Sequence, residues 1–234
     1  MNLKNAAFKR TTVAAIALSA ALGMAACSSG TDSTASASSS SSVSSTASSV
    51  SNPDPAAVVP AISGGDTSVA LDQGFLDALT GLGVTPGVTG TATLADGAVD
   101  FPITGGTVTL YDKDSGYRPF VQGVIFHQGS GLSLTAGATT VELSNFVVDP
   151  GKPARLFGDV SVNGELAVPS APLFDLNGTT LEPVTTDAEG NAVLTGTTVE
   201  LSAEAAQLLN TTFGVTAIPA NLVIGVATLT VATS

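Results

Sequence analysis

The sequence predicts a mainly β fold, as a single antiparallel β-sandwich or barrel-like domain with two short α-helices. Three observations support this fold class. Residues 66–234 are rich in Thr, Val, Gly and Leu and poor in Lys, Glu and Met, a composition that favours strands. Short runs of alternating apolar and polar residues are separated by frequent turn signals, as in sandwiches and barrels. Only two stretches have the apolar spacing of a helix.

The expected strands are marked by apolar residues two positions apart, which place one face of a strand in a core. These residues are Val108 and Leu110, Leu132 and Leu134, Val141 and Leu143, and Leu156, Val160 and Val162. The turn signals between them are Gly105-Gly106, Asp114-Ser115-Gly116, Gly129-Ser130-Gly131, Asp149-Pro150-Gly151, Asn163-Gly164, Asn177-Gly178 and Glu189-Gly190-Asn191. Because Asn-Gly between apolar runs is the strongest short signal for a hairpin, 163–164 and 177–178 are the best hairpin candidates.

Two capped stretches predict the helices. Asp72 is expected to cap a helix over residues 73–82, which ends at Gly83. Ser202 is expected to cap a second helix over residues 203–212. Asp and Ser side chains accept hydrogen bonds from the unpaired N–H groups of a first turn, and Gly tolerates the left-handed conformation that ends a helix.

These helices belong to an internal repeat with the order strand, cap, helix, Gly-Val-Thr, strand. The segment TSVALD at 67–72 matches TTVELS at 197–202, and TTVELS also occurs at 139–144. The repeat indicates two pseudo-symmetric halves of one domain, with a short helix in each. Chance recurrence of so few letters is the alternative.

The first 26 residues have the features of a signal peptide. Three of the seven basic residues of the chain lie in the first ten positions, and 14 apolar or small residues follow at 13–26. The segment Met24-Ala25-Ala26-Cys27 resembles the lipobox of bacterial lipoproteins. That resemblance implies cleavage before Cys27 and a diacylglyceryl lipid with palmitate-like chains on its thiol. It places the protein on the extracytoplasmic face of the bacterial cell membrane. An ordinary signal peptide with a chance cysteine is the alternative.

Residues 27–65 are expected to form a disordered tether behind the lipidated cysteine. Residues 28–51 contain 14 Ser and 3 Thr among 24 positions, too little apolar surface to offset the conformational entropy of folding. Pro and Gly residues continue this composition to residue 65. Dense Ser and Thr are also acceptors for O-linked sugars. The domain proper is therefore expected over residues 66–234.

Composition excludes several classes of function. The chain has 7 basic and 19 acidic residues and a net charge of −12, whereas nucleic-acid binding requires clustered Lys and Arg. One cysteine excludes a disulfide framework, and one histidine excludes a multi-His metal centre. His127 is the only base available for a Ser-His-Asp triad, and no Ser lies in a G-x-S-x-G motif. We therefore expect no catalytic residue and no enzyme.

One motif resembles a calcium loop. Asp112 and Asp114, followed by Gly116, have the D-x-D-x-G spacing of some Ca²⁺ sites, in which alternate side chains surround a hard cation. The alternative is a polar hairpin tip between two strands. No resident cofactor is expected, with Ca²⁺ or haem as alternatives.

The segment from Val124 through His127 to Leu134, VIFHQGSGLSL, resembles the strand–His–Gly–Leu segment of HtaA-type haem-uptake domains. The resemblance implies a β domain with two short helices. In that family a Tyr on the N-terminal helix binds haem iron and the His supports it. The corresponding helix here, QGFLDAL at 73–79, has no Tyr, and the two tyrosines are Tyr111 and Tyr117. The resemblance therefore implies a related fold with another ligand, or none.

The sequence favours a membrane-anchored surface lipoprotein whose domain binds a protein, a cell-wall polymer or a small molecule without catalysis. The first alternative is a ligand-capture lipoprotein for haem or another apolar molecule, with a pocket between sheet and helices lined by His127 and Phe126 and with Tyr111 and Tyr117 as further candidates. A divergent carbohydrate hydrolase with two carboxylates in a cleft is the second.

Overall fold

The computed structural model describes residues 52–233, and the expected signal peptide, Cys27 and the tether up to residue 51 lie outside them. The strands are β1 Ala57–Val59, β2 Gly65–Leu71, β3 Thr85–Gly90, β4 Thr93–Ala95, β5 Ala98–Pro102, β6 Gly105–Leu110, β7 Val121–Ala136, β8 Thr139–Asp149, β9 Arg155–Val162, β10 Glu165–Asn177, β11 Thr185–Thr186, β12 Ala192–Leu201 and β13 Val223–Val231. The helices are α1 Gln73–Gly81 and α2 Ala203–Phe213, and a 3₁₀ turn spans Lys113–Ser115.

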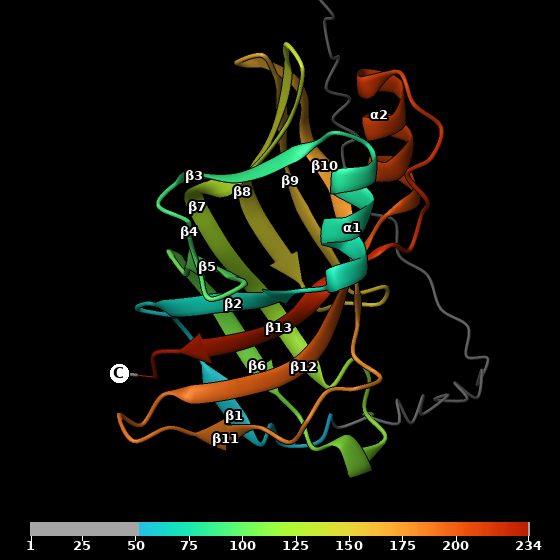
Figure 1. The fold of residues 1–234 in the computed structure, drawn as a ribbon. Helices are drawn as coiled ribbons and strands as arrows, with labels where there is room; N and C mark the ends of the chain where they lie inside the picture. Colours follow the sequence, from blue (N-terminus) through green and yellow to red (C-terminus); the bar gives the residue numbers. More distant parts are fainter. Residues whose placement is uncertain (1–51, 234) are drawn as a thin grey trace, which may run out of the picture. The chain divides into compact units, whose positions relative to one another are not determined.

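These strands form one curled antiparallel sheet of 13 strands, a half-barrel with the two helices at its upper side (Figure 1). Its order is β1-β6-β7-β8-β9-β10-β12-β13-β2-β5-β4, with β11 paired to β12 and β3 paired to β7. The prediction of a mainly β, barrel-like domain with two short helices is confirmed.

The curl is held together where the chain passes from β5 to β6. The backbone N–H of Thr104 donates to the carbonyl of Phe126 on β7, at 2.8 Å. The neighbouring N–H of Ile103 donates to the carbonyl of Gly65 on β2, also at 2.8 Å. This link therefore ties β2 to β7, although five strands separate them in the sheet order.

Both predicted helix caps are confirmed. The Asp72 carboxylate accepts from the N–H groups of Gly74 and Phe75, and Ser202 Oγ accepts from Ala205 N–H. Helix α2 ends at Gly214, whose φ of 67° is left-handed. Helix α1 ends one residue before the predicted end, with Leu82 as its C-cap.

The repeat is visible only in part. In both copies a strand leads through the capping residue into a helix, β2 into α1 and β12 into α2. After the helices the copies differ, because β3 pairs with β7 whereas β13 pairs with β12 and β2. The repeated TTVELS segments share one burial pattern over their first five residues, with their Val and Leu residues in the core. These residues are Val141, Leu143, Val199 and Leu201.

The turn predictions had mixed outcomes. Asn163-Gly164 joins β9 to β10 with φ angles of 53° and 83°, as predicted for a hairpin. The hairpin prediction at 177–178 is wrong. The strand that pairs with this end of β10 is β12, and residues 178–191, which include the short strand β11, connect the two. The turn predicted at 129–131 is a bulge within β7, where residues 128–130 lie opposite Asn145 alone. Asn145 Oδ1 accepts the Gly129 N–H at 3.0 Å and so replaces a ladder bond.

The last part of the expected tether contains ordered structure. Strand β1 pairs with β6, and the side chain of Ile62 is buried in the core. The predicted boundary at residue 65 therefore lies too late in the chain by several residues. Between residues 52 and 233, no helix is long and apolar enough to cross a membrane.

Candidate functional site

The concave side of the sheet encloses a cavity of about 450 Å³, within the range of small-molecule sites. Its walls come from strands on both sides of the curl. The apolar wall residues include Val69, Val99, Phe101, Val108, Ile125, Phe146, Val148, Leu156, Phe174, Leu176, Leu194, Val199, Ala227, Leu229 and Val231. Its lining also includes exposed residues of three loops, so the cavity reaches the surface.

The walls are apolar because the strand period is two, so that every second residue of a strand faces inward. On β13 the inward residues are Ala227, Leu229 and Val231, whereas Val226 points outward and is 42% exposed. The apolar residues whose alternation predicted a core therefore line a cavity, because the interior of the curled sheet is wider than these side chains can fill.

Three loops surround the mouth. They are the β6–β7 loop with Arg118, Pro119 and Phe120, the β8–β9 loop with Pro150 to Ala154, and the β10–β11 loop with Gly178, Leu181 and Val184. In Figure 1 the β6–β7 loop and strand β11 lie toward the lower end of the sheet, away from α1 and α2.

A polar pair lies in the cavity wall. His127 Nε2 and Thr67 Oγ1 are 2.8 Å apart, and the two residues join β7 to β2 across the curl. His127 is only 1% exposed, and its ring is nearly perpendicular to that of Phe101, with the ring centres 6.4 Å apart. Burial lowers the pKa of His127 from 6.5 to about 4, and the backbone of Phe146 opposes this in part. The ring is therefore neutral at pH 7, and its Nδ1 makes no hydrogen bond of standard geometry.

The mouth of the cavity carries positive charge. Arg118 and Lys152 are in its lining, whereas none of the described residues that line it is Asp or Glu. The guanidinium of Arg118 donates to the carbonyls of Tyr117 at 2.8 Å and Lys113 at 3.0 Å. Lys113 Nζ donates to the carbonyl of Leu181, at 3.0 Å, and so joins two of the mouth loops.

Lys113 and Arg118 both lie near one aromatic ring. Lys113 Nζ is 5.2 Å and Arg118 Cζ is 5.8 Å from the centre of the Phe120 ring. Such distances allow cation–π attraction, which fixes the cations beside an apolar surface. Phe120 itself lines the cavity, so the charges border the apolar wall directly.

The other sequence candidates lie outside this cavity. Phe126 is adjacent to His127 on β7 and therefore faces the other side of the sheet, and it does not line the cavity. Tyr111 and Tyr117 belong to the β6–β7 loop and pack on each other, with ring centres 4.6 Å apart, but neither is in the cavity lining.

The aspartates of the calcium-like motif form part of a 3₁₀ turn. Asp112 Oδ1 accepts the backbone N–H of Asp114 at 2.8 Å, as a capping residue does. The described residues contain no group of three or more His, Cys, Asp or Glu side chains placed to hold a metal ion.

The space between sheet and helices, where the sequence placed a pocket, holds a cavity of only about 40 Å³. Side chains from both helices fill it, among them Phe75, Leu79, Leu209 and Phe213. Leu132, Phe174 and Ile224 border both cavities and separate this packed end from the large one. The predicted location was therefore wrong, because the apolar faces of the helices are used for packing.

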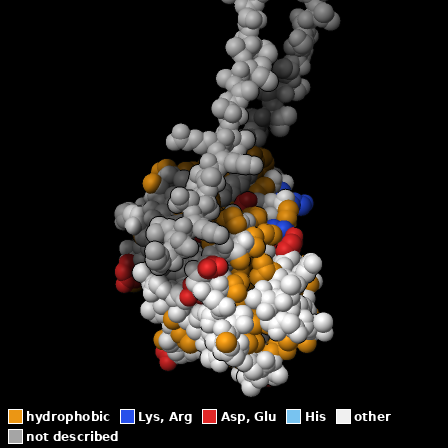
Figure 2. Space-filling view, turned by 90° about the horizontal axis from the view of Figure 1, so that it is seen from above, with side chains coloured by type: hydrophobic (Ala, Val, Ile, Leu, Met, Phe, Trp, Pro, Cys, Tyr) orange, Lys and Arg blue, Asp and Glu red, His pale blue; other side chains and the backbone are white. Residues whose placement is uncertain are grey.

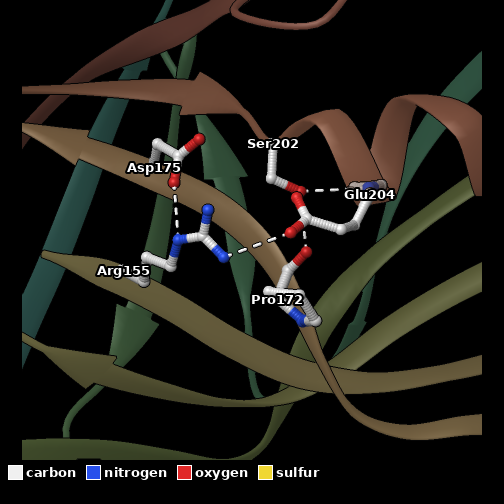
Figure 3. A network of polar contacts seen from close by, with 6 residues as sticks. Arg155, Pro172, Asp175, Ser202 and Glu204 are labelled. Atoms are coloured by element: carbon white, nitrogen blue, oxygen red, sulfur yellow. Dashed lines mark hydrogen bonds and ion pairs between the residues drawn. The ribbon is translucent and has the colours of Figure 1, made fainter. Parts of the chain in front are cut away.

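Polar contacts fasten α2 to the sheet at the packed end (Figure 3). Arg155 on β9 forms ion pairs with Asp175, at 2.9 Å, and with Glu204, at 3.3 Å. Ser202 Oγ donates to the carbonyl of Pro172 at 2.7 Å.

The surface seen from above carries scattered acidic side chains and few basic ones around a band of hydrophobic side chains (Figure 2).

Sequence reasoning missed Thr67, Arg118 and Lys152. The two cations had one available signal, because only four basic residues follow Cys27, and two of them line this cavity. Thr67 had none, since its contact with His127 joins positions 60 residues apart.

Three solved structures of two proteins from Corynebacterium glutamicum are similar to this chain. The C-terminal domain of HtaA has a TM-score of 0.51 and 13% identity, over 73% of this chain and 98% of that domain. The N-terminal domain of HtaA has a TM-score of 0.48 and 16% identity, over 74% and 98%. The heme binding protein HtaB has a TM-score of 0.46 and 14% identity, over 76% and 96%. No protein-family model and no curated protein matches the chain. The likeness to the C-terminal domain of HtaA supports the fold that the resemblance around His127 implied.

Proposed function

We propose that residues 52–233 form a non-catalytic domain that captures an apolar small molecule in the large cavity. The observation that carries this proposal is the cavity itself, about 450 Å³ of space with an almost wholly apolar wall and a mouth at the surface. Burial of a ligand's apolar surface there yields about 25 cal/mol per Å² removed from water. Among the described residues that form the wall there is no pair of carboxylates for hydrolysis, which disfavours the carbohydrate hydrolase.

Haem is the ligand of the HtaA-type domains that the segment around His127 resembles, but the residues present here do not fit its iron. Helix α1 has no Tyr, and the two tyrosines pack on each other beside the mouth. His127 Nε2 is engaged by Thr67, and the ring is 1% exposed. The proposed ligand is therefore held by apolar contact rather than through a metal.

The proposal places the domain on the outer face of the cell membrane, tethered through a lipid on Cys27. Its support is the lipobox-like segment at 24–27. Two acyl chains suffice for stable attachment. Replacing Cys27→Ser in the full chain is expected to move the protein from the membrane fraction to the medium, or to leave it unprocessed. Unchanged fractionation would contradict the anchor.

Capture is tested by photocrosslinking. The full chain is purified and placed in phosphatidylcholine vesicles with a long-chain alcohol that carries a diazirine, a neutral probe. Ala227→Phe fills the cavity from β13, and Val226→Phe adds the same ring to the outer face of that strand. We expect adducts on cavity residues of the wild-type chain and of Val226→Phe, and an at least tenfold lower yield for Ala227→Phe.

Leu194→Trp on β12 serves as a second filling variant if Ala227→Phe does not unfold cooperatively. Adducts confined to the outer surface would overturn the proposal, as would equal cavity labelling in the filled and control variants.

A further inference from the structure

The charge around the mouth narrows the class of ligand. In the described part of the chain there are four basic residues and every acidic residue of the protein except Asp32. Three of the four basic residues, Lys113, Arg118 and Lys152, lie at or beside the mouth of the cavity. A strongly acidic domain thus concentrates its few cations where a ligand enters.

Within the part of the chain that the structure describes, these three cations have no carboxylate partner. Among residues 52–233, the ion pairs are those of Arg155 with Asp175 and Glu204. Three acidic residues lie near these cations in sequence. Asp112 accepts from Asp114 N–H and Asp149 accepts from Gly151 N–H, within their own turns. Asp114 is in neither of the two ion pairs of the described residues. The cations at the mouth are therefore available to an external anion.

The positions of two of these cations, Arg118 and Lys113, are also fixed in advance. Arg118 is held by two backbone carbonyls and Lys113 by a third, and both lie over Phe120. Backbone carbonyls orient a cation without neutralising its charge, so both keep their attraction for an anion. Because charge-assisted hydrogen bonds strengthen beside apolar surface, an anionic group at the rim is favoured over a neutral one.

We infer that the ligand is an anionic amphiphile, whose apolar body fills the cavity and whose acidic head group binds Arg118 and Lys152 at the mouth. A long-chain carboxylate has this chemistry, and so does a single-chain phospholipid. This inference rests on the proposed function, because it assigns a head group to the molecule captured in the same cavity.

The test compares two diazirine probes of equal chain length, a fatty acid and a fatty alcohol, on the full chain in phosphatidylcholine vesicles. The variant Arg118→Gln with Lys152→Gln removes both lining cations. Arg155→Gln is the matched control, because it removes a cation that does not line the cavity. Each variant is compared with wild type for the same probe, which cancels the different partitioning of the two probes into the vesicles.

We expect the double variant to lower cavity labelling by the acid about tenfold, since two partly exposed ion pairs together account for roughly that change. Labelling by the alcohol should stay unchanged, and Arg155→Gln should change neither probe. An equal fall for both probes, or none for the acid, would overturn the head-group inference while capture stands. Cavity labelling by neither probe would instead overturn the proposed function.

Competition then identifies the source of the anion. Unlabelled fatty acid, lysophosphatidylglycerol and metal-free protoporphyrin are added against the acid probe. Preferential displacement by one of them assigns a carboxylate chain, a phospholipid or a flat dicarboxylate. Displacement by none would contradict a specific site.

Discussion

The two ends of the curled sheet use the same kind of residue for different purposes. At the helix end, apolar side chains of α1, α2 and the sheet leave about 40 Å³ of space. At the other end, similar side chains surround about 450 Å³. The difference is the second layer, because the helices cover only one end of the concave face (Figure 1). A curled sheet without a covering element keeps its interior open, and the local sequence pattern is the same in both cases.

Truncating one leucine at each end of the sheet tests this difference in packing most directly. Leu209 on α2 is 4% exposed and fully packed, whereas Leu194 on β12 is half-buried in the cavity wall. We expect Leu209→Ala to lower the free energy of unfolding by about 2–5 kcal/mol. Leu194→Ala should lower it by less than about 1.5 kcal/mol, because the wall side chain already lacks contacts on one side. Urea unfolding measures both, and equal losses would contradict an open cavity.

The pH dependence of the free energy of unfolding tests how well His127 is shielded from water in the cavity wall. Its pKa is lowered in the folded protein, so the unfolded chain binds a proton between pH 6.5 and about 4 that the folded chain does not. Stability is therefore complete above pH 6.5 and falls on acidification, by about 2 kcal/mol from pH 7 to pH 5.

The carboxylates with lowered pKa values behave differently, because their contribution is lost only as pH falls below their ordinary range. Among them are Asp159, through its bond from Asn145, and Glu204, through the backbone at the start of α2 and then Arg155. Denaturation curves between pH 5 and 7 thus isolate the only histidine of the chain. His127→Gln should remove the slope. A wild-type slope of zero would mean that water in the cavity reaches the ring.

The smallest expected difference in stability is between the variants of the two helix caps. Ser202 is fully buried and bonds both Ala205 N–H and the Pro172 carbonyl, whereas Asp72 is exposed and caps α1 alone. We expect Ser202→Ala to cost about 1–2 kcal/mol and Asp72→Ala about 0.5–1 kcal/mol. Thermal melts of the two variants test the order. A larger loss for Asp72→Ala would show that α1, rather than α2, is the more tightly fixed cover.

Sequence patterns predicted what depends on neighbouring residues. Alternation located the strands, Asp72 and Ser202 located the helix starts, and Asn163-Gly164 located a hairpin. The Gly-rich stretch at 129–131 was misread, since the same glycines serve a turn or a bulge and only the partner strand decides between them.

The cavity could not be predicted from local sequence patterns, for a related reason. Its walls join strands from β1 to β13, so its size depends on the curl of the whole sheet. His127 was chosen as a candidate from its sequence, and the structure places it in the cavity wall. The importance of Arg118 and Lys152 appears only when their loops meet at one mouth.

The contact between Thr67 and His127 has a consequence for how the chain folds. Hairpins such as β7–β8 and β9–β10 join neighbours in sequence and close quickly, whereas this contact spans 60 residues and needs five intervening strands in place. We expect it to form after the rate-limiting step. Its loss should then accelerate unfolding and leave the refolding rate unchanged. The lifetime of the closed sheet, and with it the residence time of any captured molecule, would thus be set by a bond formed late.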